Sequence, residues 1–200
     1  LKVLLKAEDR CGADQIVPGD REGRRHRAHI AKASEGLFSG VAAIGDGLLR
    51  GQVKHPGNGE VTSAAQAARD LQDDGVGWVV VAGEGYGEGG PCELAALVPR
   101  YLGGAAVLAK SFGGVHEANM KRHGLLPLVF SDESDFESVD AGDELSLSGL
   151  EGLGSGNPLT LTGTKADGRS YSFEVRHSFA PHEAKWFREG GFLNILKAAA

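Results

Sequence analysis

Short apolar runs alternate with more polar, helix-forming stretches along the first two thirds of the chain. Four apolar runs have the length of buried strands: residues 2–6, 77–82, 105–109 and 126–130. Three stretches predict helices: residues 64–71, 92–98 and 115–123. Such strand–helix–strand alternation is typical of parallel βαβ units. We therefore expect a parallel core with helices packed on it.

The pattern changes after residue 131. An acidic stretch at 132–140 is followed by three short alternating segments, which predict a β-meander or small β-layer: residues 145–150, 159–164 and 170–175. Residues 181–200 predict two short helices separated by Gly190 and Gly191. The fold class expected from these patterns is α/β, one compact three-layer β/β/α unit with a parallel βαβ core and a small β-layer.

Composition narrows the class of protein. A hydrophobic fraction of 41% and a charged fraction of 24% exclude disorder, and a length of 200 residues indicates one globular domain or a tight pair. No apolar run approaches the ~18 residues of a membrane helix, so no membrane insertion is expected. The net charge of −6 does not favour nucleic acid. The chain opens on Leu1 and its single methionine is Met120, so we expect a processed form, an excised domain or part of a longer chain.

A glycine-rich loop follows the predicted central strand. Residues 85–90 satisfy G-x-G-x-x-G between a strand and a helix, the context of a dinucleotide-binding loop. Glu84 and Glu88 would repel a pyrophosphate, and no acidic residue follows at the spacing that holds a ribose. The alternatives are a tight strand-to-helix turn and a small carboxylate site formed by backbone N–H groups.

Several stretches carry a resemblance to a known family: residues 78–89, 110–112 (Lys-Ser-Phe), 116–119 (His-Glu-Ala-Asn), 124–128 (Gly-Leu-Leu-Pro-Leu), 177–179 and 186–188. Together they resemble the swivel domain of aconitase, in the wording of its mitochondrial type. The resemblance implies a single swivel-like domain over residues 1–200, in which 1–76 is divergent and 77–200 is strongly family-like. It also implies a mitochondrial location, on the matrix side.

The resemblance implies a chemistry that this sequence departs from. Aconitases dehydrate and rehydrate a tricarboxylic acid on a [4Fe–4S] cluster of the large domains, while the swivel domain supplies a serine base and arginines. The family's Gly-Ser-Ser-Arg-Glu falls here on Gly89-Gly90-Pro91-Cys92-Glu93, so the serine positions are Gly90 and Pro91. Neither has a side-chain oxygen, and Cys92 cannot replace a two-pronged arginine contact. The family's other substrate arginine corresponds to Arg24, but the residues that follow Arg24 differ from those of the family.

Two functions of different class follow. We favour a catalytically inactive swivel domain, serving as a structural or accessory subunit of a larger mitochondrial assembly. The alternative is the swivel domain or small subunit of a divergent aconitase-type hydro-lyase, acting on a di- or tricarboxylic acid. In either case the chain is expected to bind no cofactor, and a partner would supply any [4Fe–4S] cluster. The partners expected are other protein subunits or an aconitase-like large domain. If the site is vestigial, restoring Ser at 90 and 91 and Arg at 92 should be tolerated.

A basic cluster stands out in this acidic chain: Arg21, Arg24, Arg25, His26, Arg27, His29 and Lys32. We expect Arg25, Arg27 and His29 to contact a partner macromolecule across the former active-site face. A solvated surface and a remnant of the substrate-binding side are the alternatives, and RNA binding is disfavoured because the cluster lacks interleaved aromatic residues.

The cysteines are too few for a cluster or a disulfide scaffold, since Cys11 and Cys92 are the only two. At a predicted helix start, Cys92 is either a reactive thiol or a small side chain tolerated there, and no histidine lies near it in sequence to act as its base.

Overall fold

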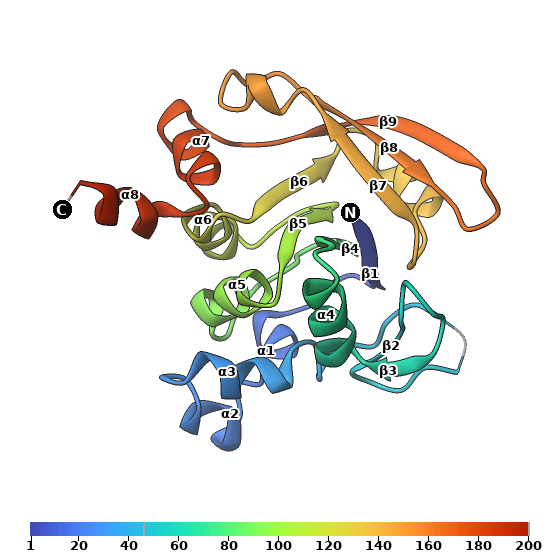
Figure 1. Cartoon of the computed structure of the whole chain (residues 1–200), viewed down its shortest axis with the longest axis vertical. Helices are drawn as coiled ribbons and strands as arrows, with labels where there is room; N and C mark the ends of the chain where they lie inside the picture. The colour runs from blue at the N-terminus through green and yellow to red at the C-terminus, as the bar shows by residue number, and fades with distance from the viewer. Residues whose placement is uncertain (46, 200) are drawn as a thin grey trace.

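A closed seven-stranded barrel forms the centre of the molecule, in the order β1-β4-β5-β6-β9-β8-β7 (Figure 1). The structure, a computed structural model, describes residues 1–45 and 47–199. Four parallel strands make one half of the barrel: β1 (Lys2–Ala7), β4 (Trp78–Ala82), β5 (Gly104–Ala109) and β6 (Leu126–Phe130). Three antiparallel strands complete it: β7 (Glu144–Ser148), β8 (Leu159–Thr164) and β9 (Ser170–Arg176).

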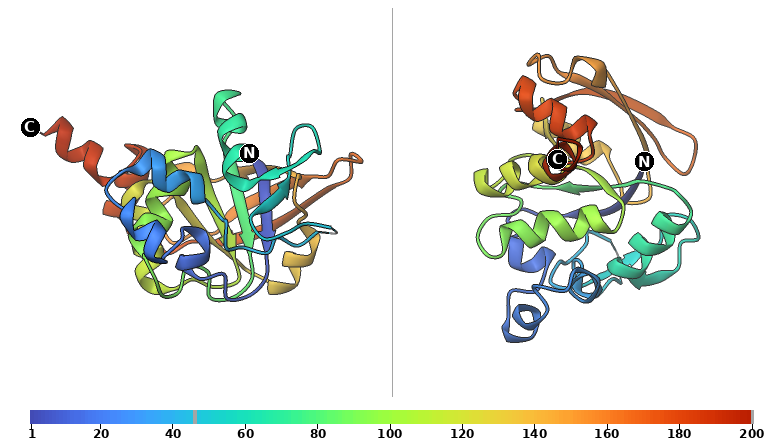
Figure 2. Two further views of the ribbon diagram at one scale, coloured as in Figure 1. Left: turned by 90° about the horizontal axis from the view of Figure 1, so that it is seen from below. Right: turned by 60° about the vertical axis from the view of Figure 1, so that its left-hand side comes forward.

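Helices cover the outside of the parallel half of the barrel, and further helices form the end of the chain. The longer ones are α4 (Ala64–Asp73), α5 (Cys92–Tyr101), α6 (Gly114–His123), α7 (Pro181–Arg188) and α8 (Phe192–Ala198). Between β1 and α4 lie the short helices α1 (Ala13–Ile16), α2 (Arg21–Arg25) and α3 (Ile30–Ala33), and the hairpin of β2 (Gln52–Lys54) and β3 (Val61–Ser63). Short 3₁₀ helices are η1 (Ser34–Gly36), η2 (Glu133–Ser138) and η3 (Leu150–Gly152). Figure 2 shows α8 extending away from the barrel.

The central strand β4 is buried on both faces, which explains its unbroken apolar sequence. Val79 and Val81 belong to the core inside the barrel, while Val80 and Ala82 belong to the core under the helices. The adjacent α4 begins where the Ser63 hydroxyl accepts a hydrogen bond from the Gln66 amide at 3.1 Å, as its sequence predicts. The prediction of a parallel core flanked by helices is confirmed.

The expected small β-layer does not stand apart from the parallel core. Its strands close the same sheet, because β9 pairs antiparallel with β6 (Phe130 with Val175) and β7 pairs with β1 (Lys2 with Glu144). The architecture shown is a mixed α/β domain whose parallel and antiparallel strands share one barrel. Of the helices in the described residues, none is long and apolar enough to cross a membrane.

Two prolines lie at α5. Pro91 occupies the N-cap, and the helix begins at Cys92, as its sequence predicts. Pro99 does not end the helix, which continues to Tyr101 with the proline buried inside it. Because a proline near a helix end removes only one backbone hydrogen bond, burial of its ring against the core offsets the loss.

Candidate functional site

The loop between β4 and α5, residues 83–91, is fixed by neighbouring loops at the carboxyl ends of the parallel strands. The Gly87 amide donates to the Cys11 carbonyl at 2.8 Å, and the Ala13 amide donates to the Glu88 carbonyl at 3.0 Å. On the other side, the Tyr86 amide donates to the Ser111 carbonyl at 3.0 Å. The loop after β1 and the loop after β5 therefore hold this segment from both sides.

Glycine is required at two positions of this loop. Gly87 has φ +79, and a Cβ atom there would lie 2.0 Å from Cδ2 of the buried His116 ring. Gly90 has φ +53, and a Cβ atom there would lie 3.0 Å from the Asp14 backbone nitrogen. Both are left-handed conformations that favour glycine. The glycine pattern is accounted for by these close approaches, which supports the tight-turn interpretation of the motif.

The expectation that serine is tolerated at position 90 stays a prediction, and the geometry of Gly90 argues against it. A serine there would be strained by its φ and would press against the first turn of α1. At a position where the resembled family has a serine, the conformation of this chain therefore favours glycine.

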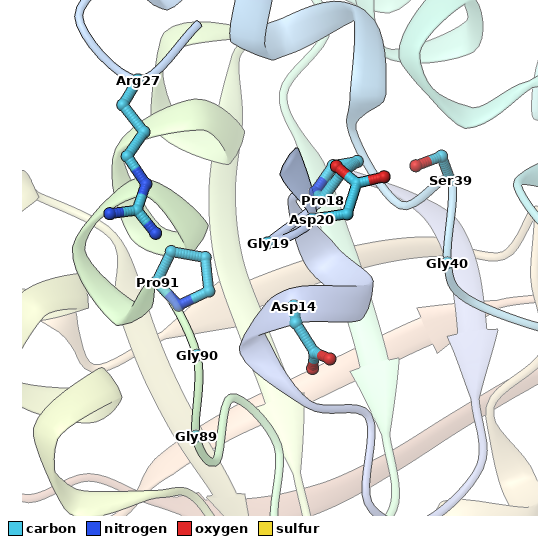
Figure 3. Close-up of a pocket in the computed structure, with 10 residues that line it drawn as sticks. All are labelled: Asp14, Pro18, Gly19, Asp20, Arg27, Ser39, Gly40, Gly89, Gly90 and Pro91. Atoms are coloured by element: carbon cyan, nitrogen blue, oxygen red, sulfur yellow. The ribbon is translucent and has the colours of Figure 1, made fainter. Parts of the chain in front are cut away.

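A cleft of about 980 Å³ opens where this loop faces the segment after β1 (Figure 3). It lies within the usual size range of small-molecule sites, about 300–1,000 Å³. Its lining residues come from four separate segments: Asp14, Pro18, Gly19, Asp20, Arg27, Ser39, Gly40, Gly89, Gly90 and Pro91. A second hollow of about 580 Å³ adjoins it and is lined by Arg27, Gly90, Pro91, Cys92, Glu93, Leu94 and Leu97.

The walls of the larger cleft carry charges of opposite sign. Asp14, on α1, and Asp20, just before α2, contribute carboxylates, and both are exposed. Arg27, in the turn between α2 and α3, extends its guanidinium toward Pro91 (Figure 3). Ser39 contributes a hydroxyl. The arrangement suits a small polar ligand that carries both a negative charge and a hydrogen-bond donor.

Cys92 lies at the start of α5, and a histidine that is distant in sequence contacts its backbone. His116 reaches it from α6, with Nδ1 3.2 Å from the Cys92 carbonyl oxygen. Since a carbonyl only accepts, the ring proton lies on Nδ1. Burial lowers the pKa of His116 to about 4, so the ring is neutral near pH 7. The Cys92 thiol donates to the Gly89 carbonyl at 2.8 Å, and this bond holds the start of the helix against the loop.

The residues of this chain do not fit an iron–sulfur cluster. Burial raises the pKa of the Cys11 thiol to about 12, so it offers no thiolate at neutral pH. Among the side chains that the structure describes, no group of three or more His, Cys, Asp or Glu is placed to hold a metal ion.

The candidate site residues predicted from the sequence do not all lie together in the structure. Gly90, Pro91 and Arg27 meet at one cleft. Arg24 lies in α2, and its side chain is outside the described residues. Arg25 is exposed on the same helix, and His29 caps α3, accepting a hydrogen bond from the Lys32 amide through Nδ1 at 3.3 Å.

Three cleft residues escaped the sequence reasoning: Asp14, Asp20 and Ser39. None of the three carries a local signal in the sequence, because only the packing of distant loops brings them to the cleft.

Comparisons with known proteins agree with the sequence resemblance. Residues 2–133 match the family described as the aconitase C-terminal domain. The mitochondrial aconitate hydratase of Gracilaria gracilis is 40% identical over 98% of this chain and 25% of its own length. That of Saccharomyces cerevisiae is 34% identical over 99% of this chain and 25% of its own. The chain thus spans about a quarter of the length of these relatives.

A solved structure shares the fold. The 3-isopropylmalate dehydratase of Methanocaldococcus jannaschii DSM2661 superposes with a TM-score of 0.58 at 19% sequence identity, covering 98% of this chain and 91% of that one. At this identity the likeness concerns the fold alone.

Proposed function

The chain belongs to the aconitase C-terminal domain family, and from that premise we propose that it is the swivel domain of an aconitase-type hydro-lyase. The observation that carries the proposal is the end-to-end alignment of 98% of the chain with one quarter of proteins named aconitate hydratase. The cleft at the carboxyl end of β4 supports it, since ligand sites of parallel α/β sheets lie at this edge. This assignment agrees better with the alternative expectation from the sequence, a divergent hydro-lyase, than with the favoured expectation, a catalytically inactive domain.

We propose that the domain works together with a cluster-bearing large domain or subunit. When bound there, a [4Fe–4S] cluster would supply Lewis-acid chemistry. The part played by this chain would be to bind and orient a di- or tricarboxylic acid in the cleft between Asp14 and Arg27. By analogy with the relatives, we propose a mitochondrial location.

A chimera tests this proposal. The C-terminal quarter of the Saccharomyces cerevisiae aconitate hydratase would be replaced by this chain, and hydration of cis-aconitate would be measured after cluster reconstitution. Activity that depends on the presence of this chain is the result the proposal expects. A chimera that folds, holds its cluster and shows no activity would favour the second candidate below.

That second candidate is an inactive domain with a structural or accessory role. The observation that favours it is the composition of the loop at the cleft, where Gly90 and Pro91 present no side-chain hydroxyl and Cys92 presents a thiol engaged with Gly89. The loss of the catalytic motif is part of this candidate. In it, Arg25 and His29 would contact an acidic surface of a partner.

A further inference from the structure

The last helix, α8, presents apolar side chains to solvent. Leu193 is 61% exposed and Leu196 is 51% exposed, and the helix extends away from the barrel (Figure 2). Lys197 is exposed as well. Residues three and four positions apart share one face of a helix, so Leu193, Leu196 and Lys197 lie together. These three residues are called the α8 face below.

The domain holds α8 by its first turn. The Phe192 ring packs edge-on against the Trp186 ring of α7, with the ring centroids 5.2 Å apart. The Asn194 side-chain amide donates a hydrogen bond to the Glu189 carbonyl at 2.8 Å. These contacts fix the position of the helix without covering the α8 face.

The α8 helix is too short to be stable by itself. It has 7 residues, whereas isolated helices shorter than about 12–15 residues are marginal in water. In proteins, most of the stability of a helix comes from the packing of its apolar face. Exposed apolar side chains that cluster, unlike single ones, mark interaction sites. The α8 face is therefore suited to be covered by another protein surface.

Length and charge indicate what that surface is. The chain spans 25% of the length of the Gracilaria gracilis relative, so the rest of such a protein is about three times as long as this chain. A symmetric contact between two copies of this chain would bring the α8 face against itself, and Lys197 near its own copy. A groove with apolar walls and an acidic rim would instead accept both leucines and pair with Lys197.

We propose that the α8 face docks into an apolar groove with an acidic rim on the large, cluster-bearing part of an aconitase-type enzyme. The inference rests on the proposed function, because it takes that large part to be the partner of this chain. It assigns an interdomain contact to a helix that is separate from the segments lining the two hollows.

Hydrogen exchange of the α8 amides tests the proposal in the Saccharomyces cerevisiae chimera described above, compared with the 200-residue chain alone. We expect exchange at least about tenfold slower in the chimera, because a covered helix opens less often. The variant Leu193→Gln/Leu196→Gln should lose most of this slowing, measured against the same variant as a separate chain. Glutamine and leucine have similar helix propensities, so the helix itself is kept.

Two further variants separate the contact from general effects. Leu49→Gln/Val61→Gln makes the same kind of change at residues that are 70% and 53% exposed elsewhere on the chain, and it should keep the slowing. Lys197→Glu should lose part of the slowing, because it turns a like charge toward the acidic rim. A second chimera, with the Gracilaria gracilis relative as host, repeats the comparison if the first does not fold.

Three results would overturn the inference. One is equal α8 exchange in the chimera and in the separate chain. Another is slowing that Leu193→Gln/Leu196→Gln retains in full. The third is a dimer of the separate chain that the same variant dissociates, which would assign the α8 face to a second copy. The proposed function is judged separately by the activity of the chimera, so an active chimera with unprotected α8 amides would remove this inference alone.

Discussion

Gly90 shows how one residue ties the cleft together. Its left-handed backbone brings the β4–α5 loop within van der Waals range of the first turn of α1, and Asp14 sits in that turn. A side chain at position 90 would move the two walls of the cleft apart. Gly90 therefore sets the distance between the two walls of the cleft, in addition to lacking a hydroxyl group.

Replacing Gly90 with alanine should lower the free energy of unfolding by about 1–2 kcal/mol, from the left-handed φ and the close contact with Asp14. Gly114→Ala is the matched control, because Gly114 begins α6 and a Cβ atom there meets nothing within 4 Å. Denaturant unfolding measures both. Equal stability of the Gly90 variant and wild type would show that the loop has a different conformation in solution.

His116 makes the stability of the domain depend on pH. Its pKa is about 4 in the folded protein, from burial, and near 6.5 in an unfolded chain. Between these values the unfolded state binds the additional proton, so this stability is fully present above pH ~6.5 and is lost as the pH falls toward 4. The loss from this one group is on the order of 3 kcal/mol.

The free energy of unfolding, measured from pH 4 to 7, should therefore depend much less on pH in His116→Gln than in wild type. Glutamine keeps a donor for the Cys92 carbonyl. The control is His182→Gln, on the exposed side of α7, which should leave the slope unchanged. An unchanged pH profile in the His116 variant would contradict the assigned burial.

At the scale of elements, the seam of the barrel is the junction of β7 with β1. It contains one residue pair, Lys2 with Glu144, and depends on a polar cluster beside it. There the buried Asp143 carboxylate accepts from the Tyr171 hydroxyl at 2.7 Å and the Lys165 ammonium at 3.4 Å. The cluster joins β8 and β9 to the start of β7.

Asp143→Asn should destabilise the domain by about 2–3 kcal/mol, because it weakens a buried charged hydrogen-bond group. Hydrogen exchange should speed up in β7 before it does in β4 and β5. Asp167→Asn, which affects the exposed pair with Arg169, should change the stability much less than Asp143→Asn does. Uniform acceleration across all strands would show that the seam has no separate stability.

Elements with a strong local pattern could be predicted from the sequence, and those set by distant contacts could not. The strands β4, β5 and β6 and helices α4 and α6 follow from apolar runs and from the Ser63 cap. The helices α2 and α3 have four or five residues each in a polar stretch, too short for a periodic signal. The barrel closure depends on β9 reaching β6, and the cleft on Arg27 reaching Pro91, neither of which has a local signature.

At the scale of the whole molecule, the segment from α1 to α3 lies on one side of the domain (Figure 1). It carries the basic cluster and part of the lining of the cleft. Arg25 is exposed there, outside the cleft. If this side faces an acidic partner surface, Arg25→Glu should weaken association several-fold without changing the unfolding midpoint, and the effect should shrink at high salt. Lys54→Glu, an exposed charge reversal on β2, is the control. Equal weakening by both variants would indicate a long-range charge effect.

The central claim is that this chain is the swivel domain of an aconitase-type enzyme, and association with the rest of such an enzyme tests it most directly. The remaining three quarters of the Gracilaria gracilis aconitate hydratase, reconstituted with a [4Fe–4S] cluster, would be titrated with this chain in an analytical ultracentrifuge. The account predicts a one-to-one complex with a Kd in the micromolar range, as expected for an interdomain interface whose linker is cut. Two species that sediment independently at concentrations well above micromolar would contradict it.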